Sequence, residues 1–151
     1  MADPARRASR PTTAGLQARR AALLALFEDD FRPGQATAAL ARLVDERGLS
    51  DDVRIHAQDI VSGVAAHRAQ LDARIAAEAP LIPVTELGRV ERAILRSALY
   101  EVLYSAATPS GETMRDAVSL ARIYAGDAAR RLVNGVLGSV SRSSGGGAQT
   151  S

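Results

Sequence analysis

Apolar side chains recur three and four positions apart along most of the chain, which places them on one face of an α-helix. No stretch alternates between apolar and polar residues as a half-buried strand does. The spacing predicts helices over residues 13–31, 35–47, 51–78 and 87–106. A fifth helix follows the turn at 109–111 and ends at 126, and a sixth runs from 127 to about 142. The expected fold class is therefore all-α.

Glycine and serine mark several expected helix ends and bends. Gly48 is the expected left-handed residue that ends the second helix, and Ser50 or Asp51 is the expected cap of the third. Gly63 lies inside the third helix, where we expect a bend. Gly135 interrupts an otherwise continuous apolar stripe in the last helix, so we expect another backbone to pass close to it.

The helix over 87–106 is apolar on a wide arc, which predicts a central position among the others. In the first helix the expected buried face carries leucine and phenylalanine: Leu16, Leu23, Leu24, Phe27 and Phe31. Prolines at 80 and 83 separate an expected N-terminal half, about 13–79, from a C-terminal half, about 84–142. Residues 1–12 and 143–151 have no apolar periodicity, and we expect a disordered basic tail and a disordered Ser/Gly tail.

Composition and motifs exclude several classes of function. The chain has no cysteine, which rules out disulfides and thiolate metal sites. No apolar run approaches the roughly 20 residues of a membrane span, so we expect a cytoplasmic protein without membrane partners. We find no phosphate-binding glycine loop, zinc signature or nucleophile elbow, and expect no catalytic activity and no cofactor. His56 and His67 lie about 16 Å apart along a helix, too far for one metal ion.

Charge is unevenly distributed. The net charge is +4 over residues 1–20, −5 over 21–114 and +3 over 115–142. If the basic ends meet in space they form a patch for a polyanion, and the acidic middle faces a basic partner. The alternative is a basic tail and an ordinary solvated helix face. The densest acidic run, 28–30, is open to three interpretations: solvated surface, contact with a basic partner, or a Mg²⁺ site.

Arginines near the two ends are the candidate RNA ligands, because guanidinium forks match phosphate geometry. Tyr124 is the only aromatic residue in a basic segment, where it either stacks on a base or packs in the core. The candidate RNA-binding residues are Arg6, Arg7, Arg10, Arg19, Arg20, Arg115, Arg122, Tyr124, Arg130 and Arg131.

Three stretches in order, 90–101, 116–122 and 132–137, resemble the signature stretches of the NusB family of bacterial transcription antitermination factors. Residues 18–27 and 63–72 add supporting matches, and the likeness covers about 18–140. The resemblance implies a bundle of six to seven helices in two subdomains. It also implies a non-catalytic factor that binds single-stranded boxA-type RNA together with NusE, a small-subunit ribosomal protein. Such a factor joins the RNA polymerase antitermination complex and acts on ribosomal RNA transcription.

The resemblance also assigns residues. Arg19 and Arg20 fall in the family's arginine-rich motif, and Arg131 falls at its RNA-facing helix start. The positions that meet NusE, whose surface is basic, are Phe27, Phe31, Glu86 and Glu91.

The chain departs from the family pattern at three positions. Arg115 replaces a usual Asn, Gly111 lies in a loop without its usual basic residue, and Leu132 replaces a Phe. These departures favour an alternative hypothesis, a helical protein–protein interaction module that keeps the fold and has lost RNA binding. A third hypothesis, RNA methylation, needs a separate Rossmann-type catalytic domain for which we expect no room in this chain.

Overall fold

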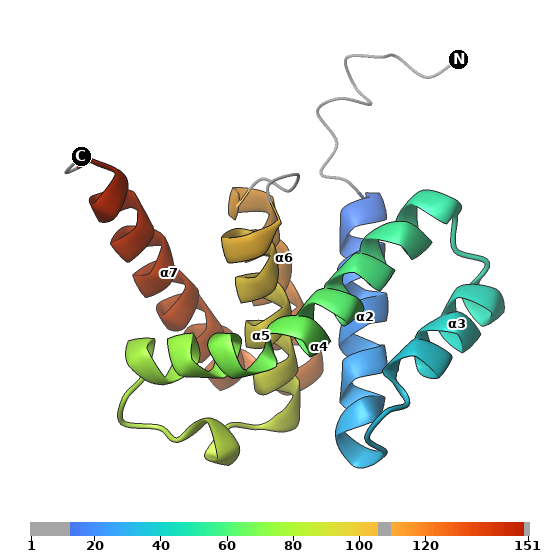
Figure 1. Ribbon diagram of the computed structural model, residues 1–151, viewed down its shortest axis with the longest axis horizontal. Helices are drawn as coiled ribbons and strands as arrows, with labels where there is room; N and C mark the ends of the chain where they lie inside the picture. The colour runs from blue at the N-terminus through green and yellow to red at the C-terminus, as the bar shows by residue number, and fades with distance from the viewer. Residues whose placement is uncertain (1–12, 106–109, 150–151) are drawn as a thin grey trace.

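A computed structural model describes residues 13–105 and 110–149, which contain helices and no strand (Figure 1). This confirms the all-α prediction, and every expected helix is present, with all ends except the end of the last helix within a few residues of the prediction. None of the helices in these two ranges is both long and apolar enough to cross a membrane. The elements are α2 (Thr13–Phe31), α3 (Ala36–Arg47), α4 (Asp51–Glu78), the short 3-10 helix η1 (Val84–Glu86), α5 (Arg89–Tyr104), α6 (Ser110–Ala125) and α7 (Asp127–Gln149).

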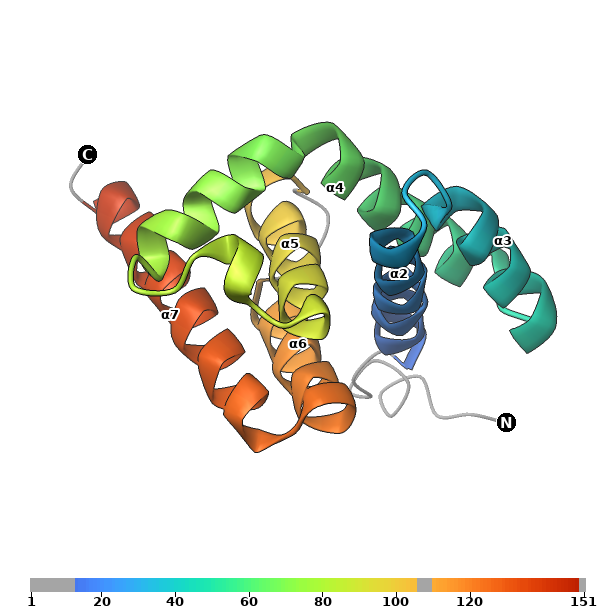
Figure 2. The ribbon, with the colours of Figure 1, turned by 90° about the horizontal axis from the view of Figure 1, so that it is seen from below.

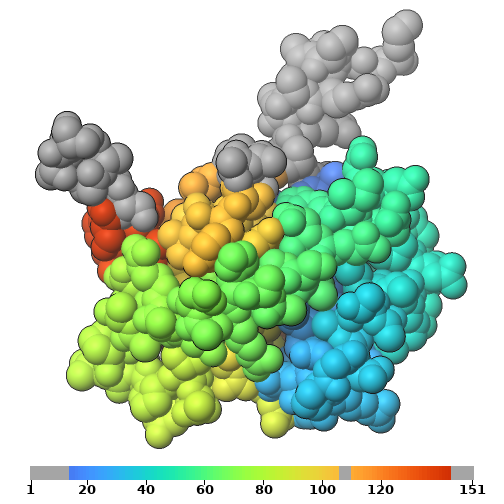
Figure 3. Space-filling view, in the orientation of Figure 1, coloured from blue at the N-terminus to red at the C-terminus, as the bar shows by residue number. Residues whose placement is uncertain are grey.

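Helix α5 is central, as its wide apolar arc predicts. It packs against α2, α4, α6 and α7 (Figure 2), while α3 and α4 cover one side of the molecule (Figure 3). One continuous cluster of buried apolar side chains joins all six helices. The division into halves near residues 80–83 stays a prediction.

Helix ends follow the local signals in the sequence. Gly48 adopts the left-handed conformation, with φ of 59°, and ends α3. The Ser50 hydroxyl accepts a hydrogen bond of 3.3 Å from the backbone N–H of Val53 and so caps α4. Both expectations are confirmed. Gly126, with φ of 92°, turns the chain between α6 and α7.

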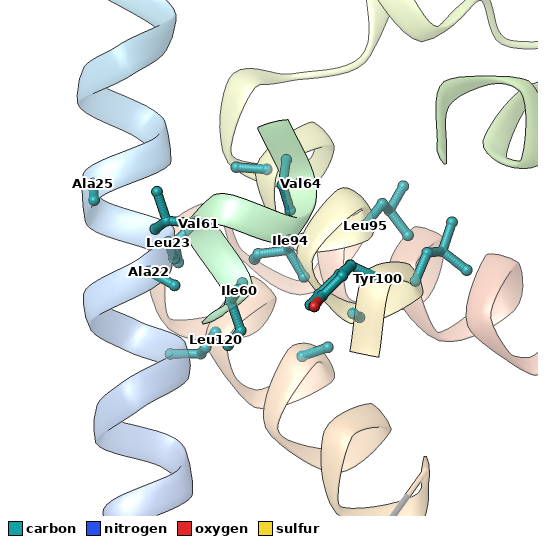
Figure 4. Packing of buried hydrophobic residues seen from close by; sticks show 14 of the residues in the cluster. Ala22, Leu23, Ala25, Ile60, Val61, Val64, Ile94, Leu95, Tyr100 and Leu120 are labelled. Atoms are coloured by element: carbon teal, nitrogen blue, oxygen red, sulfur yellow. The ribbon is translucent and has the colours of Figure 1, made fainter. Parts of the chain in front are cut away.

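The buried face of α2 differs from the expected one. Alanines supply most of it, namely Ala18, Ala21, Ala22 and Ala25, with Leu23. In Figure 4, Ala22 and Leu23 face Ile60 and Val61 of α4. Small side chains let the two helices approach closely, and the phenylalanine end of the expected face is left open: 54% of Phe31 is exposed.

Gly63 does not bend α4, contrary to expectation. The non-helical residue is His67, with φ of −115° and ψ of 16°. Gly63 instead makes room for the ring of Tyr100, because a Cβ added there would lie 2.1 Å from two atoms of that ring.

Two expectations about α7 are also wrong. A Cβ added at Gly135 would meet nothing within 4 Å, so no backbone passes close to it. The helix also continues to Gln149, past the predicted end at 142 and into the segment expected to be disordered. A helix that is already nucleated gains one hydrogen bond for each residue added, even beyond its last core contact, Val140. The expected basic tail, 1–12, and residues 150–151 lie outside the described residues.

Candidate nucleic-acid and partner interfaces

Arg19 lies in the interior and not on the surface expected for an RNA ligand. Only 5% of it is exposed. Its Nε donates to Glu101 at 2.9 Å, its Nη1 donates to Asp116 at 2.6 Å, and its Nη2 donates to the Thr113 hydroxyl at 3.3 Å. These partners belong to α5 and α6, so the guanidinium clamps α2 to both helices. The prediction that Arg19 contacts RNA is therefore wrong, because its donors are used inside the protein.

The charges in this clamp are set by burial and pairing together. Burial alone would raise the pKa of Glu101, but hydrogen bonds from His56 and Arg19 outweigh it and hold that pKa below its usual value. Burial lowers the pKa of Arg19, and the two carboxylates more than offset this, so the net shift is upward. At Asp116 burial wins over the neighbouring guanidinium and raises the pKa. Arg19 and Glu101 are thus a buried ion pair at neutral pH.

Arg20, the next residue, is only half-buried and makes no ion pair with the described residues. Its Nε is buried without a hydrogen-bond partner. Because Arg20 is half-buried and has no ion pair among the described residues, its charge is available to an anion. Of the family's arginine pair, Arg20 is therefore the one that remains available to a ligand.

Helix α6 carries two exposed arginines, Arg115 and Arg122, neither of which has a hydrogen bond or ion pair among the described side chains. They are seven residues apart and so share one face, about 10.5 Å apart along the helix. Tyr124 follows with 39% of its surface exposed. It is not a core residue, and its contact with RNA stays a prediction.

The first turn of α7 holds Arg130 and Arg131, and both donate to the same carboxylate. Nε of Arg130 lies 2.7 Å from Oδ1 of Asp127, and Nη1 of Arg131 lies 2.6 Å from Oδ2. The hydrogen bond from Arg130 and the charges of both arginines hold the pKa of Asp127 below its usual value. Each guanidinium keeps further donors for a phosphate, but that phosphate competes with Asp127.

Helix α6 brings the two basic segments together. Its first half contacts α2 through Arg19 and Asp116, and its other end leads into the first turn of α7. In Figure 2, α6 lies between α2 and the beginning of α7. The α6 row, as we call it, comprises two arginines of α6 and three from the helices on either side of it: Arg20 of α2, Arg115 and Arg122 of α6, and Arg130 and Arg131 of α7. Arg6, Arg7 and Arg10 lie outside the described residues.

The candidate partner residues meet at another corner, where α2 ends and α5 begins. Phe27 and Phe31 pack edge to face, with ring centroids 5.1 Å apart. The Arg89 guanidinium lies 4.1 Å from the centre of the Phe31 ring. Arg89 and Arg92 both donate to Asp30, at 2.8 and 2.9 Å, which holds the two helix ends together.

The two glutamates of this corner differ in exposure. Glu86 is exposed at the end of η1, and Glu91 is half-buried in the first turn of α5. The Glu91 carboxylate lies over Gly88, where an added Cβ would come within 2.3 Å of one of its oxygens. With Phe27 and Phe31 they form what we call the aromatic–acidic corner. Whether a partner binds there stays a prediction.

Each carboxylate of the acidic run at 28–30 has a partner within the protein. Glu28 pairs with Arg42. One oxygen of Asp29 accepts from three successive backbone N–H groups at the start of α3, at 2.8, 2.9 and 3.1 Å. Asp30 holds the two arginines of α5. The sequence hides these roles because the partners are distant along the chain or are backbone groups.

Both histidines have structural contacts that sequence reasoning missed. His56 Nε2 lies 2.6 Å from Glu101, in the clamp around Arg19. His67 stacks on Tyr104, with ring centroids 3.9 Å apart and planes 12° apart. The residues of each pair are far apart in the sequence and on different helices, so no local pattern indicates either contact.

Comparison with known proteins agrees with this architecture. The family model described as "NusB family" matches residues 16–142. A transcription antitermination protein NusB of Herpetosiphon aurantiacus is 39% identical over 125 residues, which cover 81% of this chain and 86% of the relative.

Two solved structures are also similar. One is a chain in the crystal structure of the antitermination factors NusB and NusE in complex with double-stranded RNA. It is 26% identical with a TM-score of 0.79, over 87% of this chain and 98% of that one. The other is the solution structure of NusB from Aquifex aeolicus, 26% identical with a TM-score of 0.73, over 87% of this chain and 89% of that one. The chain belongs to the NusB family.

Proposed function

We propose that the chain is a non-catalytic transcription antitermination factor that binds single-stranded boxA-type RNA together with NusE, within the RNA polymerase antitermination complex, and acts on ribosomal RNA transcription. The observation that carries the proposal is the α6 row, in which Arg20, Arg115 and Arg122 have no internal ion pair. Family membership supports it, because relatives are named transcription antitermination protein NusB and a similar chain was solved with NusE and RNA.

The physical basis of RNA binding is release of counterions as guanidinium groups neutralise phosphates. Five guanidiniums of the α6 row correspond to a slope of about −3.5 for log affinity against log salt with single-stranded RNA. Arg130 and Arg131 contribute less than the others because Asp127 already holds them. The aromatic–acidic corner then supplies the docking surface for NusE, where an exposed Phe31 ring and Glu86 suit a partner with apolar and basic side chains.

The test is a mobility-shift titration of boxA-type RNA at several salt concentrations, with and without NusE. We expect binding that NusE strengthens and a slope near −3.5. The double variant Arg115→Gln, Arg122→Gln makes the slope shallower by about 1.4 units. Arg47→Gln is the matched control, because Arg47 is also exposed and unpaired among the described side chains but lies on α3, away from the α6 row.

A protein-only interaction module remains the second candidate function. Arg19 is buried, and Asp127 already accepts hydrogen bonds from two arginines. Both observations favour this second function, because they reduce the number of arginines that are free to bind phosphate. In the same titration this module gives no shift of the RNA at any salt concentration, although it still binds NusE when the two proteins are mixed without RNA. That result would rule out the RNA role and leave the partner role in place.

A further inference from the structure

Three aromatic rings gather where α5 ends, outside the α6 row and the aromatic–acidic corner. The rings are His67 of α4 and Tyr100 and Tyr104 of α5, and all three are nearly parallel. His67 and Tyr104 are in direct contact, with centroids 3.9 Å apart. Tyr100 lies 6.0 Å from His67 and 6.2 Å from Tyr104.

The two tyrosines have different environments. Tyr100 is a core residue: its ring fills the space over Gly63 and its hydroxyl donates to Asp59 at 2.8 Å. Burial and the neighbouring Asp59 raise the pKa of Tyr100 to about 12, which keeps it neutral. Tyr104 is open to solvent, with 44% of its surface exposed. Because His67 covers one face of Tyr104, the exposed area lies on the remaining face and edges.

The backing of Tyr104 by His67 depends on the kink in α4. His67 is the residue with non-helical φ and ψ, and α4 contains no proline that would explain a kink. The distorted turn brings the imidazole flat against Tyr104, with 12° between the planes. Two stacked rings have less freedom than one, so Tyr104 presents a surface that is already ordered before any ligand arrives.

The position of Tyr104 connects it with the α6 row. It is the last residue of α5, and α6 begins at Ser110. Figure 1 shows that α5 ends at the same end of the bundle at which α2 and α6 begin. Arg20 and Arg115 lie in the first halves of α2 and α6. In Figure 3 the surface from the end of α5 and the start of α6 lies next to the middle of α4. Phosphate ligands and an exposed ring at one end are the combination that single-stranded RNA requires.

We infer that Tyr104, backed by His67, is a base-stacking platform that holds one nucleotide of the bound RNA. This inference rests on the proposed function and adds a contact with a base to the contacts with phosphates. Stacking tolerates any base because every base has a π-face, so the platform adds affinity and fixes the position of the strand without reading its sequence. The alternative role for the ring pair is only to attach α4 to α5.

The experiment measures the binding of fluorescein-labelled boxA-type RNA, with NusE, by fluorescence anisotropy. Tyr104→Ala is expected to weaken binding about 5- to 140-fold, and Tyr104→Phe, which keeps the ring, to stay within about twofold of the wild-type protein. A set of RNAs, each with one abasic nucleotide, then locates the stacked base. The RNA that lacks the stacked base is the one that binds the wild-type protein and Tyr104→Ala with equal affinity.

Each other outcome overturns the inference. If Tyr104→Ala binds intact RNA like the wild-type protein, no base stacks on this ring. If Tyr104→Ala loses affinity equally for every abasic RNA, the ring supports the fold and not a base, and thermal unfolding of that variant shows the corresponding loss of stability. If the wild-type protein does not bind the RNA at all, the proposed function fails first, and this outcome is distinct because it precedes any comparison of variants.

Discussion

Replacing Arg19 by methionine tests the buried clamp directly. Methionine replaces the unbranched stem of arginine with another unbranched apolar chain and removes the guanidinium, with its charge and all its donors. Glu101 is 1% exposed, and it loses the guanidinium while keeping its hydrogen bond from His56. Asp116 loses its 2.6 Å contact. We therefore expect two acidic groups without their cation in the interior of the bundle.

The expected cost follows from that arrangement. Removal of one partner of a buried ion pair costs about 3–5 kcal/mol, since the other charge stays buried. The remaining His56 contact to Glu101 favours the lower end, about 3 kcal/mol. For a domain of this size that loss corresponds to a fall of about 6–12 °C in the melting temperature. The loss is a large part of the free energy of unfolding of a typical domain, about 5–15 kcal/mol.

Urea unfolding followed by far-ultraviolet circular dichroism measures the effect. Arg20→Met is the matched control: it changes the next residue of the same helix, which is half-buried and has no ion pair among the described side chains, and it should cost under about 1 kcal/mol. A double-mutant cycle with Glu101→Gln should show a coupling of about 0.5–3 kcal/mol. If Arg19→Met unfolds at the same urea concentration as Arg20→Met, the clamp does not stabilise the fold.

The clamp also predicts how stability depends on pH. The folded pKa of Glu101 is below its unfolded value, near 4.5, so its contribution is present above that pH and is lost as the pH falls through the folded pKa. The folded pKa of Asp116 is raised, so its contribution has the opposite sign: it is present below the unfolded pKa, near 3.8, and is lost as the pH rises through the folded pKa. In Arg19→Met, protonation of Glu101 should therefore remove less of the free energy of unfolding than it does in the wild-type protein. Urea unfolding curves measured between about pH 3 and pH 6, the range in which both carboxylates titrate, would detect this difference.

Three further predictions concern the helices. Gly63→Ala should destabilise the fold by about 1–3 kcal/mol because the new Cβ meets Tyr100. Gly135→Ala should instead stabilise it by about 0.5–1 kcal/mol, because alanine has the higher helix propensity and the added Cβ lies in open space. Equal shifts of the urea midpoint in the two variants would contradict both predictions. Leu137→Ala should cost about 2–5 kcal/mol, since the side chain is 1% exposed, and a cost under about 0.5 kcal/mol would contradict its packing in the core. Asp127→Asn should raise RNA affinity about two- to fivefold by freeing the two arginines beside it, and unchanged or weaker binding would show that they do not contact phosphate.

The sequence predicts local structure better than it predicts contacts between helices. Helix ends at Gly48 and Ser50 follow from their own chemistry, since a left-handed glycine and a capping hydroxyl act on neighbouring backbone. Gly63 and Gly135 are both glycines inside helices, and the expectations for them are reversed in the structure. Only the position of Tyr100, 37 residues after Gly63, decides which glycine has a close neighbour.

The candidate site shows the same limit. Arg19 and Arg20 are adjacent and chemically identical, but Arg19 is a buried clamp and Arg20 is half-buried without an ion pair among the described residues. The difference comes from Glu101 and Asp116, which are 82 and 97 residues away. The stack of His67 on Tyr104 likewise joins two helices and depends on a kink that no proline marks. Charge arithmetic indicates a basic row, but not which of its members are free.

The clamp also affects the order of events during synthesis on the ribosome. Arg19 is made early, and its last carboxylate, Asp116, is made 97 residues later. Until α6 leaves the exit tunnel, the guanidinium has Glu101 of α5 as its carboxylate partner and lacks Asp116, so α2 is not yet fixed against α6. A nascent chain interrupted before α6 therefore lacks one arm of the clamp and exposes the face of α5 that α6 covers, and such a fragment is a substrate for chaperones and proteases.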